Sequence, residues 1–255
     1  MRRLAARAAF VGLALGAWQV ASSLATSRVL LPPPADVLAW VGRAAADGTL
    51  AASALVTLRR LAVGYLLGLA VGLPLGVLCA RWRIAEDTVG LAAVGVQSLP
   101  SVCWAPLAML WFGANERAML FIVLMGTVGS IVLATAHGIR SVPSIYARAA
   151  RTMGSKGLHT WTSVIVPASM PAVVAGMKQA WAFAWRSLMA AEIYVVVAGH
   201  AGLGLLLHYG REFHAMDQVL GVILLIVTLG VAFDRLLFAP VEAALHRRWG
   251  TGRTP

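Results

Sequence analysis

The sequence has few charged residues, and acidic ones are especially scarce. Only 12% of its 255 residues are charged, against roughly 25% in an average soluble domain. Asp and Glu together number 10, whereas 60% of the residues are hydrophobic and the mean hydropathy is +0.79. A soluble domain this apolar could not cover its core with polar surface. The composition therefore predicts that lipid surrounds most of the chain.

Features of several other protein classes are also missing. The two cysteines, Cys79 and Cys103, both lie in apolar runs, so we expect buried apolar side chains rather than a disulfide framework. No histidine forms an i, i+4 pair with another histidine or a cysteine, so we expect no metal site. No glycine-rich phosphate loop occurs, and we expect no bound cofactor. If ATP drives this protein, another chain must bind it.

Long apolar runs are the dominant feature that is present. Each is close to or above the roughly 20 residues that a helix needs to cross the hydrocarbon core. They predict an all-α polytopic membrane protein with six spans, at about 8–25, 57–80, 88–112, 118–138, 172–198 and 217–238. The third run is interrupted by Gln97, Pro100 and Pro106.

The net charge of +11 reports orientation rather than nucleic-acid binding, because the basic residues lie mainly at the ends of the apolar runs. One set of ends holds 13 of the 21 Lys and Arg: Arg2, Arg3, Arg7, Arg81, Arg83, Arg140, Arg148, Arg151, Lys156, Lys178, Arg247, Arg248 and Arg253. The opposite set holds six: Arg28, Arg43, Arg59, Arg60, Arg117 and Arg211. The richer side should be cytoplasmic, which places both termini inside.

The N-terminal part allows two interpretations. Its first apolar run resembles a signal peptide, but it is long for one, and we favour a retained span. In the less hydrophobic segment 26–56, residues 36–46 predict a short amphipathic helix on the outer membrane surface, with Val37, Trp40 and Val41 on one stripe.

The longest cytoplasmic connection, 139–171, predicts a short amphipathic helix at 143–153. Ile145, Ala149 and Met153 recur at i, i+4 and i+8 and form an apolar stripe that nothing in the chain is obviously placed to cover. Gly154 suits the position just past the helix end, where a left-handed backbone is common.

A family resemblance becomes specific in this segment. Ala149 and Ala150, then Gly154, nine residues, and Val164-x-Val166-Pro167 resemble the EAA loop of permease subunits of type I ABC importers. The family motif begins with Glu, where this chain has Arg148. The resemblance implies that Arg148, Ala149, Ala150, Arg151, Gly154 and Pro167 form the coupling contact with an ATP-binding subunit.

Further short motifs, which occur in the same order as in the family, extend the resemblance over about residues 53–249. They favour the branch that imports nitrate, sulfonates and taurine. They are Thr57-Leu58-x-Arg60, Gln97-x-Leu99-Pro100, Ala105-Pro106-Leu107, Leu110-Trp111-Phe112-Gly113, Trp185, Ala191-Glu192, Gly202-Leu203-Gly204 and Asp234. The resemblance implies a permease core at 53–249, preceded by an N-terminal span and extracytoplasmic segment at 1–52. It also implies a second, identical permease copy, two ATP-binding subunits, an extracytoplasmic solute-binding protein and alternating access in the cytoplasmic membrane.

Two sets of residues within the spans are candidates for defined roles. The glycines Gly64, Gly68, Gly72 and Gly76 recur every four residues, and we expect them to permit close helix packing rather than to contact substrate. Arg186 lies near the middle of the 172–198 run, with Gln179 on the same face and Glu192 about 120° around the helix. These three are candidates for the pathway, with Arg186 attracting an anion. A structural ion pair of Arg186 with an acid on another span or on a partner copy is the alternative.

Two other classes of membrane protein remain as alternatives. An intramembrane enzyme needs a polar catalytic set, which Arg186, Glu192 and Asp234 do not make. An ion channel needs no ATPase. Co-purification with an ATP-binding subunit separates these classes from an importer.

Overall fold

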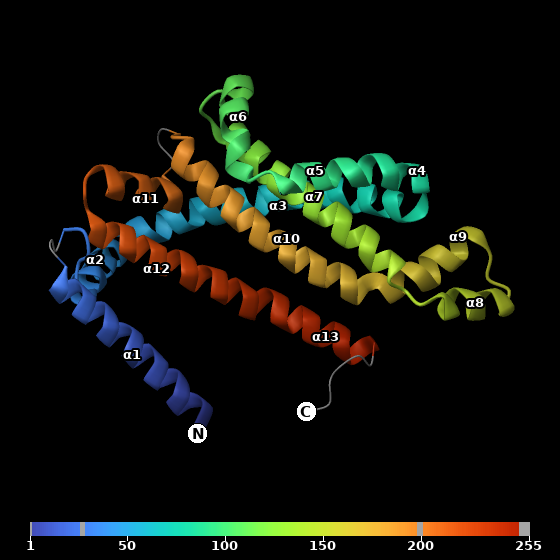
Figure 1. Cartoon of the computed structure of the whole chain (residues 1–255), viewed down its shortest axis with the longest axis horizontal. Helices are drawn as coiled ribbons and strands as arrows, with labels where there is room; N and C mark the ends of the chain where they lie inside the picture. The colour runs from blue at the N-terminus through green and yellow to red at the C-terminus, as the bar shows by residue number, and fades with distance from the viewer. Residues whose placement is uncertain (1, 26–28, 198–200, 250–255) are drawn as a thin grey trace. The chain divides into compact units, whose positions relative to one another are not determined.

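The computed structural model describes residues 2–25, 29–197 and 201–249 (Figure 1). Within these ranges all regular elements are helices, some of them short π or 3₁₀ turns labelled η. In chain order they are α1 (Arg2–Leu24), α2 (Pro34–Ala46), α3 (Thr49–Arg81), α4 (Arg83–Ala85), η1 (Glu86–Gly90), α5 (Leu91–Ser98), η2 (Ser101–Trp104), α6 (Ala105–Phe112), α7 (Glu116–Arg140), α8 (Ser144–Thr152), α9 (Gly157–Thr160), η3 (Trp161–Ile165), α10 (Val166–Tyr194), α11 (Leu203–Glu212), α12 (Met216–Phe233), η4 (Asp234–Phe238) and α13 (Ala239–Trp249).

The helices agree with the apolar runs, and the all-α polytopic fold is confirmed. Four continuous helical stretches are long and apolar enough to cross a membrane: Thr49–Arg81, Glu116–Arg140, Gly157–Tyr194 and Met216–Leu245. The third run forms a pair of helical segments bent by 99°, and the first contains the shorter apolar helix Ala9–Leu24. Residues 26–28 of the segment 26–56 and residue 198 of the fifth run lie outside the described ranges.

The bend in the third run follows from its prolines. Pro100 disfavours a helical backbone at the residue before it, and Leu99 is extended with φ −84° and ψ 132°. Pro106 lies in the first turn of α6, where a missing N–H costs nothing. The α5 helix therefore ends at Ser98 and a new helical segment begins at Ser101 in another direction, visible where α6 turns away from α5 (Figure 1).

The chain divides into two compact units. The first comprises Met1–Thr57 and Ala198–Leu229, and the second comprises Leu58–Val197 and Gly230–Pro255. In the first unit, a core of residues from α2, the beginning of α3, α11 and α12 surrounds Val222 and Leu203, both fully buried. The hydroxyl of Thr57 accepts a hydrogen bond from Leu203 N at 2.8 Å and holds the beginning of α11.

The apolar stripe predicted within residues 36–46 is packed inside the protein. Val37 is fully buried, and Trp40 and Val41 pack into the core of the first unit. A Cβ at Gly221 of α12 would lie only 2.6 Å from Cε3 of Trp40, so glycine is what lets α2 approach α12 this closely. The stripe is covered by the chain itself.

In the second unit, α7 is the central helix and the glycine stripe of α3 packs against it. A Cβ at each of the four glycines would meet a side chain of α7 at 2.5–2.7 Å. The pairs are Gly64 with Val123, Gly68 with Thr127, Gly72 with Ile131, and Gly76 with Thr135. Both sets advance by four residues in the same direction, so α3 and α7 run parallel with their backbones in close approach.

The two cysteines differ in their surroundings. Cys79 is buried, as expected, but Cys103 is exposed in the 3₁₀ turn η2. The expectation that both are buried is therefore wrong for Cys103, because the bend of the third run turns this segment outward rather than into a continuous helix.

Candidate permeation cavity and coupling segment

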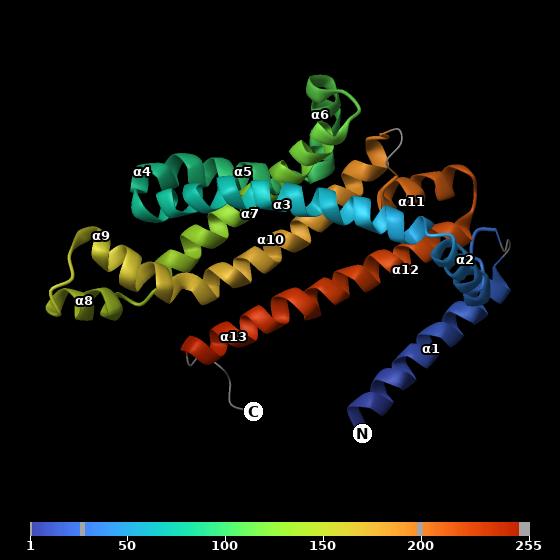
Figure 2. The ribbon, with the colours of Figure 1, turned by 180° about the vertical axis from the view of Figure 1, so that it is seen from behind.

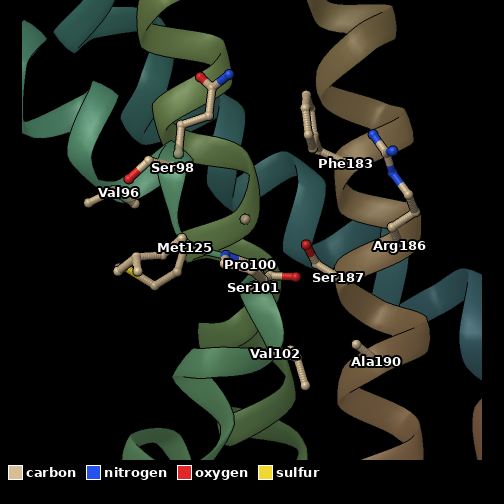
Figure 3. Close-up of a pocket in the computed structure, with 13 residues that line it drawn as sticks. Val96, Ser98, Pro100, Ser101, Val102, Met125, Phe183, Arg186, Ser187 and Ala190 are labelled. Atoms are coloured by element: carbon tan, nitrogen blue, oxygen red, sulfur yellow. The ribbon is translucent and has the colours of Figure 1, made fainter.

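A cavity of about 410 Å³ opens where the broken third span faces α7 and α10 in the second unit (Figure 3). Its walls come from the end of α5, the break itself, the middle of α7 and one face of α10. The lining residues are Val96, Gln97, Ser98, Leu99, Pro100, Ser101, Val102, Met125, Gly126, Phe183, Arg186, Ser187 and Ala190.

Arg186 carries the only charge among these lining residues. Its Nε donates to the carbonyl oxygen of Ala182 at 3.2 Å, and its guanidinium lies 4.6 Å from the ring centroid of Phe183. Both contacts are on its own helix, along which the side chain extends toward Phe183 (Figure 3). In the described part of the chain, no carboxylate oxygen lies within 4.0 Å of this guanidinium.

A glycine brings three elements together at the base of this cavity. A Cβ at Gly126 of α7 would collide with the Ser187 hydroxyl and lie 3.2 Å from Cβ of Ser101. The hydroxyls of Ser101 and Ser187 point toward one another (Figure 3). One turn on, a Cβ at Gly129 would lie 2.7 Å from the carbonyl oxygen of Ala93. The wall around Arg186 therefore combines a guanidinium with small hydroxyl side chains.

The three candidate pathway residues have different surroundings, and one of them, Arg186, lines the cavity. Gln179 is exposed on α10 and does not line the cavity. Glu192 is fully buried and pairs with Arg60 of α3 at 3.0 Å. The helix also ends at Tyr194, so Arg186 lies eight residues before its end, about 12 Å along the axis, rather than midway along a span.

Sequence reasoning missed the ion pairs that connect the helices. Arg60 contacts Glu116 at 3.2 Å as well as Glu192, and the exposed Arg59 contacts Glu116 at 2.6 Å. A second group joins Lys178 of α10 with Asp234 at 2.7 Å and Glu242 at 3.4 Å. These ion pairs could have been suspected from the sequence, because charged residues within or next to apolar runs need partners.

The segment predicted to couple to an ATP-binding subunit lies between the end of α7 and the beginning of α10, as Figure 2 shows from behind. Its helix α8 spans Ser144–Thr152, close to the predicted 143–153, and ends as the sequence indicates. Gly154 has φ +88°, Gly154 N donates to the carbonyl oxygen of Arg151 at 3.0 Å, and Ser155 N donates to that of Ala150 at 2.9 Å. This pair of hydrogen bonds is a Schellman motif, which requires a left-handed residue at Gly154.

The stripe of α8 faces outward. Ile145 is 56% exposed and Met153 is 86% exposed, and Ala149 is exposed between them. Of the other predicted coupling residues, Arg148 and Arg151 are exposed and Ala150 is buried. Pro167 is half-buried in the first turn of α10. The segment thus presents an apolar strip between cationic side chains.

Within the described ranges, no group of three or more His, Cys, Asp and Glu could hold a metal ion. The cavity around Arg186 and the exposed helix α8 are formed by different residues of the second unit.

Residues 72–239 match the family of the binding-protein-dependent transport system inner membrane component. The chain belongs to this family, the membrane-spanning permease subunits of ABC importers. The family works with ATP-binding subunits and solute-binding proteins. The predicted class is confirmed: the chain is a transport component and not an enzyme.

Individual members of this family and one solved structure are similar to the chain. A putative ABC transporter permease protein of Methanocaldococcus jannaschii is 32% identical over 188 residues, covering 74% of this chain and 70% of that protein. The putative aliphatic sulfonates transport permease protein SsuC of Escherichia coli is 30% identical over 233 residues, covering 91% and 87%. The structure is similar to the inward-facing MetNI methionine ABC transporter, with a TM-score of 0.62, 20% identity and coverage of 75% and 93%, a likeness that concerns the fold.

Proposed function

We propose that this permease forms, with a second identical copy, the alternating-access pathway for a small anion such as a sulfonate. The observation that carries this proposal is the guanidinium of Arg186, which lines the cavity at the broken span without a carboxylate partner in the described residues. An arginine within a membrane-spanning helix is costly to insert, and such residues commonly mark substrate pathways.

The chemistry of the cavity suits an oxyanion. A guanidinium offers five N–H donors in a planar fork that matches sulfonate or carboxylate oxygens. Ser101 and Ser187 contribute hydroxyls to the same cavity, and the remaining wall is largely apolar. The similarity to a relative named for aliphatic sulfonates supports the same class of substrate. Gln179 and Glu192 take no part in this wall, so the proposal rests on Arg186 alone among the three.

Replacing Arg186 by Gln should strongly slow anion uptake while leaving assembly intact. Removing a charge-assisted contact of about 1.5–3 kcal/mol predicts at least about tenfold slower uptake of the favoured anion. The measurement is uptake of a panel of labelled sulfonates and nitrate in cells that carry the variant as their sole copy. Arg186→Lys should retain part of the activity. Arg235→Gln, at an exposed arginine that does not line this cavity, is the control. Loss of the assembled complex in Arg186→Gln would instead indicate a structural ion pair with the partner copy.

We also propose that the ends rich in Lys and Arg are cytoplasmic, so that the segment with α8 and both termini lie inside. The charge asymmetry supports this orientation. Arg28 and Arg253, which belong to the two sets, lie outside the described residues. A reporter fused after residue 160 should be active in the cytoplasm, and one fused after residue 115 outside. If the reporter after residue 160 were active outside instead, the orientation would be the opposite of the one proposed. The helix α8 could then not contact a cytoplasmic ATP-binding subunit.

We propose that α8 is the coupling helix, which an ATP-binding subunit moves when it binds ATP. Its exposed apolar stripe and its position at the ends of α7 and α10 support this role. Arg148, Ala149, Ala150, Arg151, Gly154 and Pro167 would form or orient that contact. Because Arg148 replaces the Glu of the motif, the facing position of the ATP-binding subunit would have to accommodate a cation.

Gly154→Val should uncouple ATP hydrolysis from transport. Valine at φ +88° is strained, yet a Cβ there meets no atom within 4 Å, so the effect comes from the backbone alone. Gly154→Asn is the matched control, since asparagine tolerates the left-handed region. In proteoliposomes, the Val variant should lose transport-linked ATPase stimulation and the Asn variant should keep most of it. Normal transport with valine would show that the end of α8 does not transmit motion.

A further inference from the structure

A second cavity, of about 510 Å³, lies in the second unit where the end of α3 meets the segment from α8 to η3. It is lined by Arg81, Ala147, Arg151, Ser155, Lys156, Gly157, Thr160, Trp161 and Ile165. None of these residues lines the cavity around Arg186.

Three cations and no acid line this second cavity. Arg81 ends α3, Arg151 is in the last turn of α8, and Lys156 precedes α9. In the described part of the chain, none of the three forms an ion pair within 4.0 Å. Three like charges around one cavity repel each other, and an anion held among them would relieve that repulsion.

Neighbouring groups are arranged to complete an oxyanion site. The guanidinium of Arg81 lies 5.5 Å from the ring centroid of Trp161, a cation–π contact that restricts its orientation. The hydroxyls of Ser155 and Thr160 are 2.9 Å apart in the wall, and Thr160 is only 6% exposed. Guanidinium groups bind phosphate oxygens through two parallel hydrogen bonds, and lysine contributes a point charge.

We propose that this cavity binds a phosphate group, with the phosphodiester of an anionic phospholipid headgroup as the source that its position favours. Arg81 is the last residue of one membrane-spanning helix, and Trp161 lies near the beginning of the spanning stretch Gly157–Tyr194. Tryptophan and arginine at the ends of spanning helices lie at headgroup depth, and basic pockets between such helices bind anionic headgroups. A bound phosphate would link Arg81 of α3 to Arg151 of α8 and hold α8 against the membrane helices.

The test measures lipid binding to the full chain in complex with its ATP-binding subunits, delipidated in neutral detergent. Phosphatidylglycerol and phosphatidylcholine are titrated and followed by native mass spectrometry. The variant Arg81→Gln/Arg151→Gln/Lys156→Gln should bind phosphatidylglycerol about tenfold or more weakly, with unchanged phosphatidylcholine binding. The control Arg83→Gln/Arg117→Gln/Arg235→Gln removes the same charge from exposed arginines outside the cavity and should bind as the unaltered chain does.

Inorganic phosphate at about 10 mM distinguishes the two sources of the same group. If phosphate displaces phosphatidylglycerol and chloride at the same ionic strength does not, the two phosphate-bearing ligands share one site. Phosphate binding that needs the three cations, without selective phosphatidylglycerol binding, would assign the site to a free anion and overturn the lipid source. Lys156→Gln alone changes an exposed residue and should weaken binding even if the triple variant fails to assemble. Equal loss in the control set, or binding only when the ATP-binding subunits are removed, would overturn the proposal.

Discussion

Glu192→Ala is expected to cost about 3–5 kcal/mol of folding free energy, because it leaves the buried Arg60 guanidinium without its buried partner. Arg60 is 2% exposed and Glu192 is fully buried, at a distance of 3.0 Å. Glu116, which is partly exposed, would still contact Arg60 at 3.2 Å. The measurements are thermal unfolding of the purified chain in detergent and the yield of folded protein from membranes.

Arg59→Gln is the matched control for this loss. Its side chain is 56% exposed, and it contacts the same Glu116 at 2.6 Å, so its removal should cost less than about 1 kcal/mol. The double variant Arg60→Met/Glu192→Leu should regain much of the stability, since apolar side chains often replace a buried ion pair at little cost. Equal stability of Glu192→Ala and Arg59→Gln would show that the buried pair contributes nothing beyond a surface contact.

The spans and the end of α8 could be predicted from sequence because interactions within a single segment determine them. Apolar length set the positions of α3, α7, α10 and α12, and the prolines of the third run marked its break. The left-handed Gly154 followed from its place after an amphipathic helix. In each case the deciding interactions lie within one segment of the chain.

The contacts between distant segments could not be predicted in the same way. Arg60 and Glu192 are 132 positions apart. From the sequence, Arg60 counted among the basic residues at the outer ends of the apolar runs, and Glu192 was a candidate for the pathway. Which acid faces which base depends on helix rotation and on how far each helix extends. The position of Arg186 shows the same effect, because α10 begins before the apolar run and ends at Tyr194. The burial of the α2 stripe could not be predicted either, because nothing local indicated that residues of α11 and α12 would pack against it.

The spacing of the four glycines in the sequence correctly predicted a close contact between helices. Enlarging these glycines should lower the stability of the protein strongly. Gly72→Leu and Gly76→Leu should each cost about 1–3 kcal/mol or more, because α3 and α7 would have to separate. At Gly76, a Cβ would lie 2.5 Å from Cβ of Thr135 and 2.8 Å from the carbonyl oxygen of Val132, and that backbone cannot move aside alone. Thermal unfolding and the yield of assembled complex report the loss.

Neighbouring positions on the same helix separate packing from a general intolerance of larger residues in α3. Val77→Leu enlarges a side chain that is already 38% exposed and should leave stability and assembly almost unchanged. A repaired pair provides the sharper comparison. In Gly64→Ala the new methyl group would lie 2.7 Å from Cγ1 of Val123, and adding Val123→Ala removes that atom. The double variant should therefore be more stable than Gly64→Ala alone, although it has the smaller core side chain. If the double variant were instead less stable than Gly64→Ala, the stripe would tolerate added volume by a shift of α3. Close approach to α7 would then not be its function.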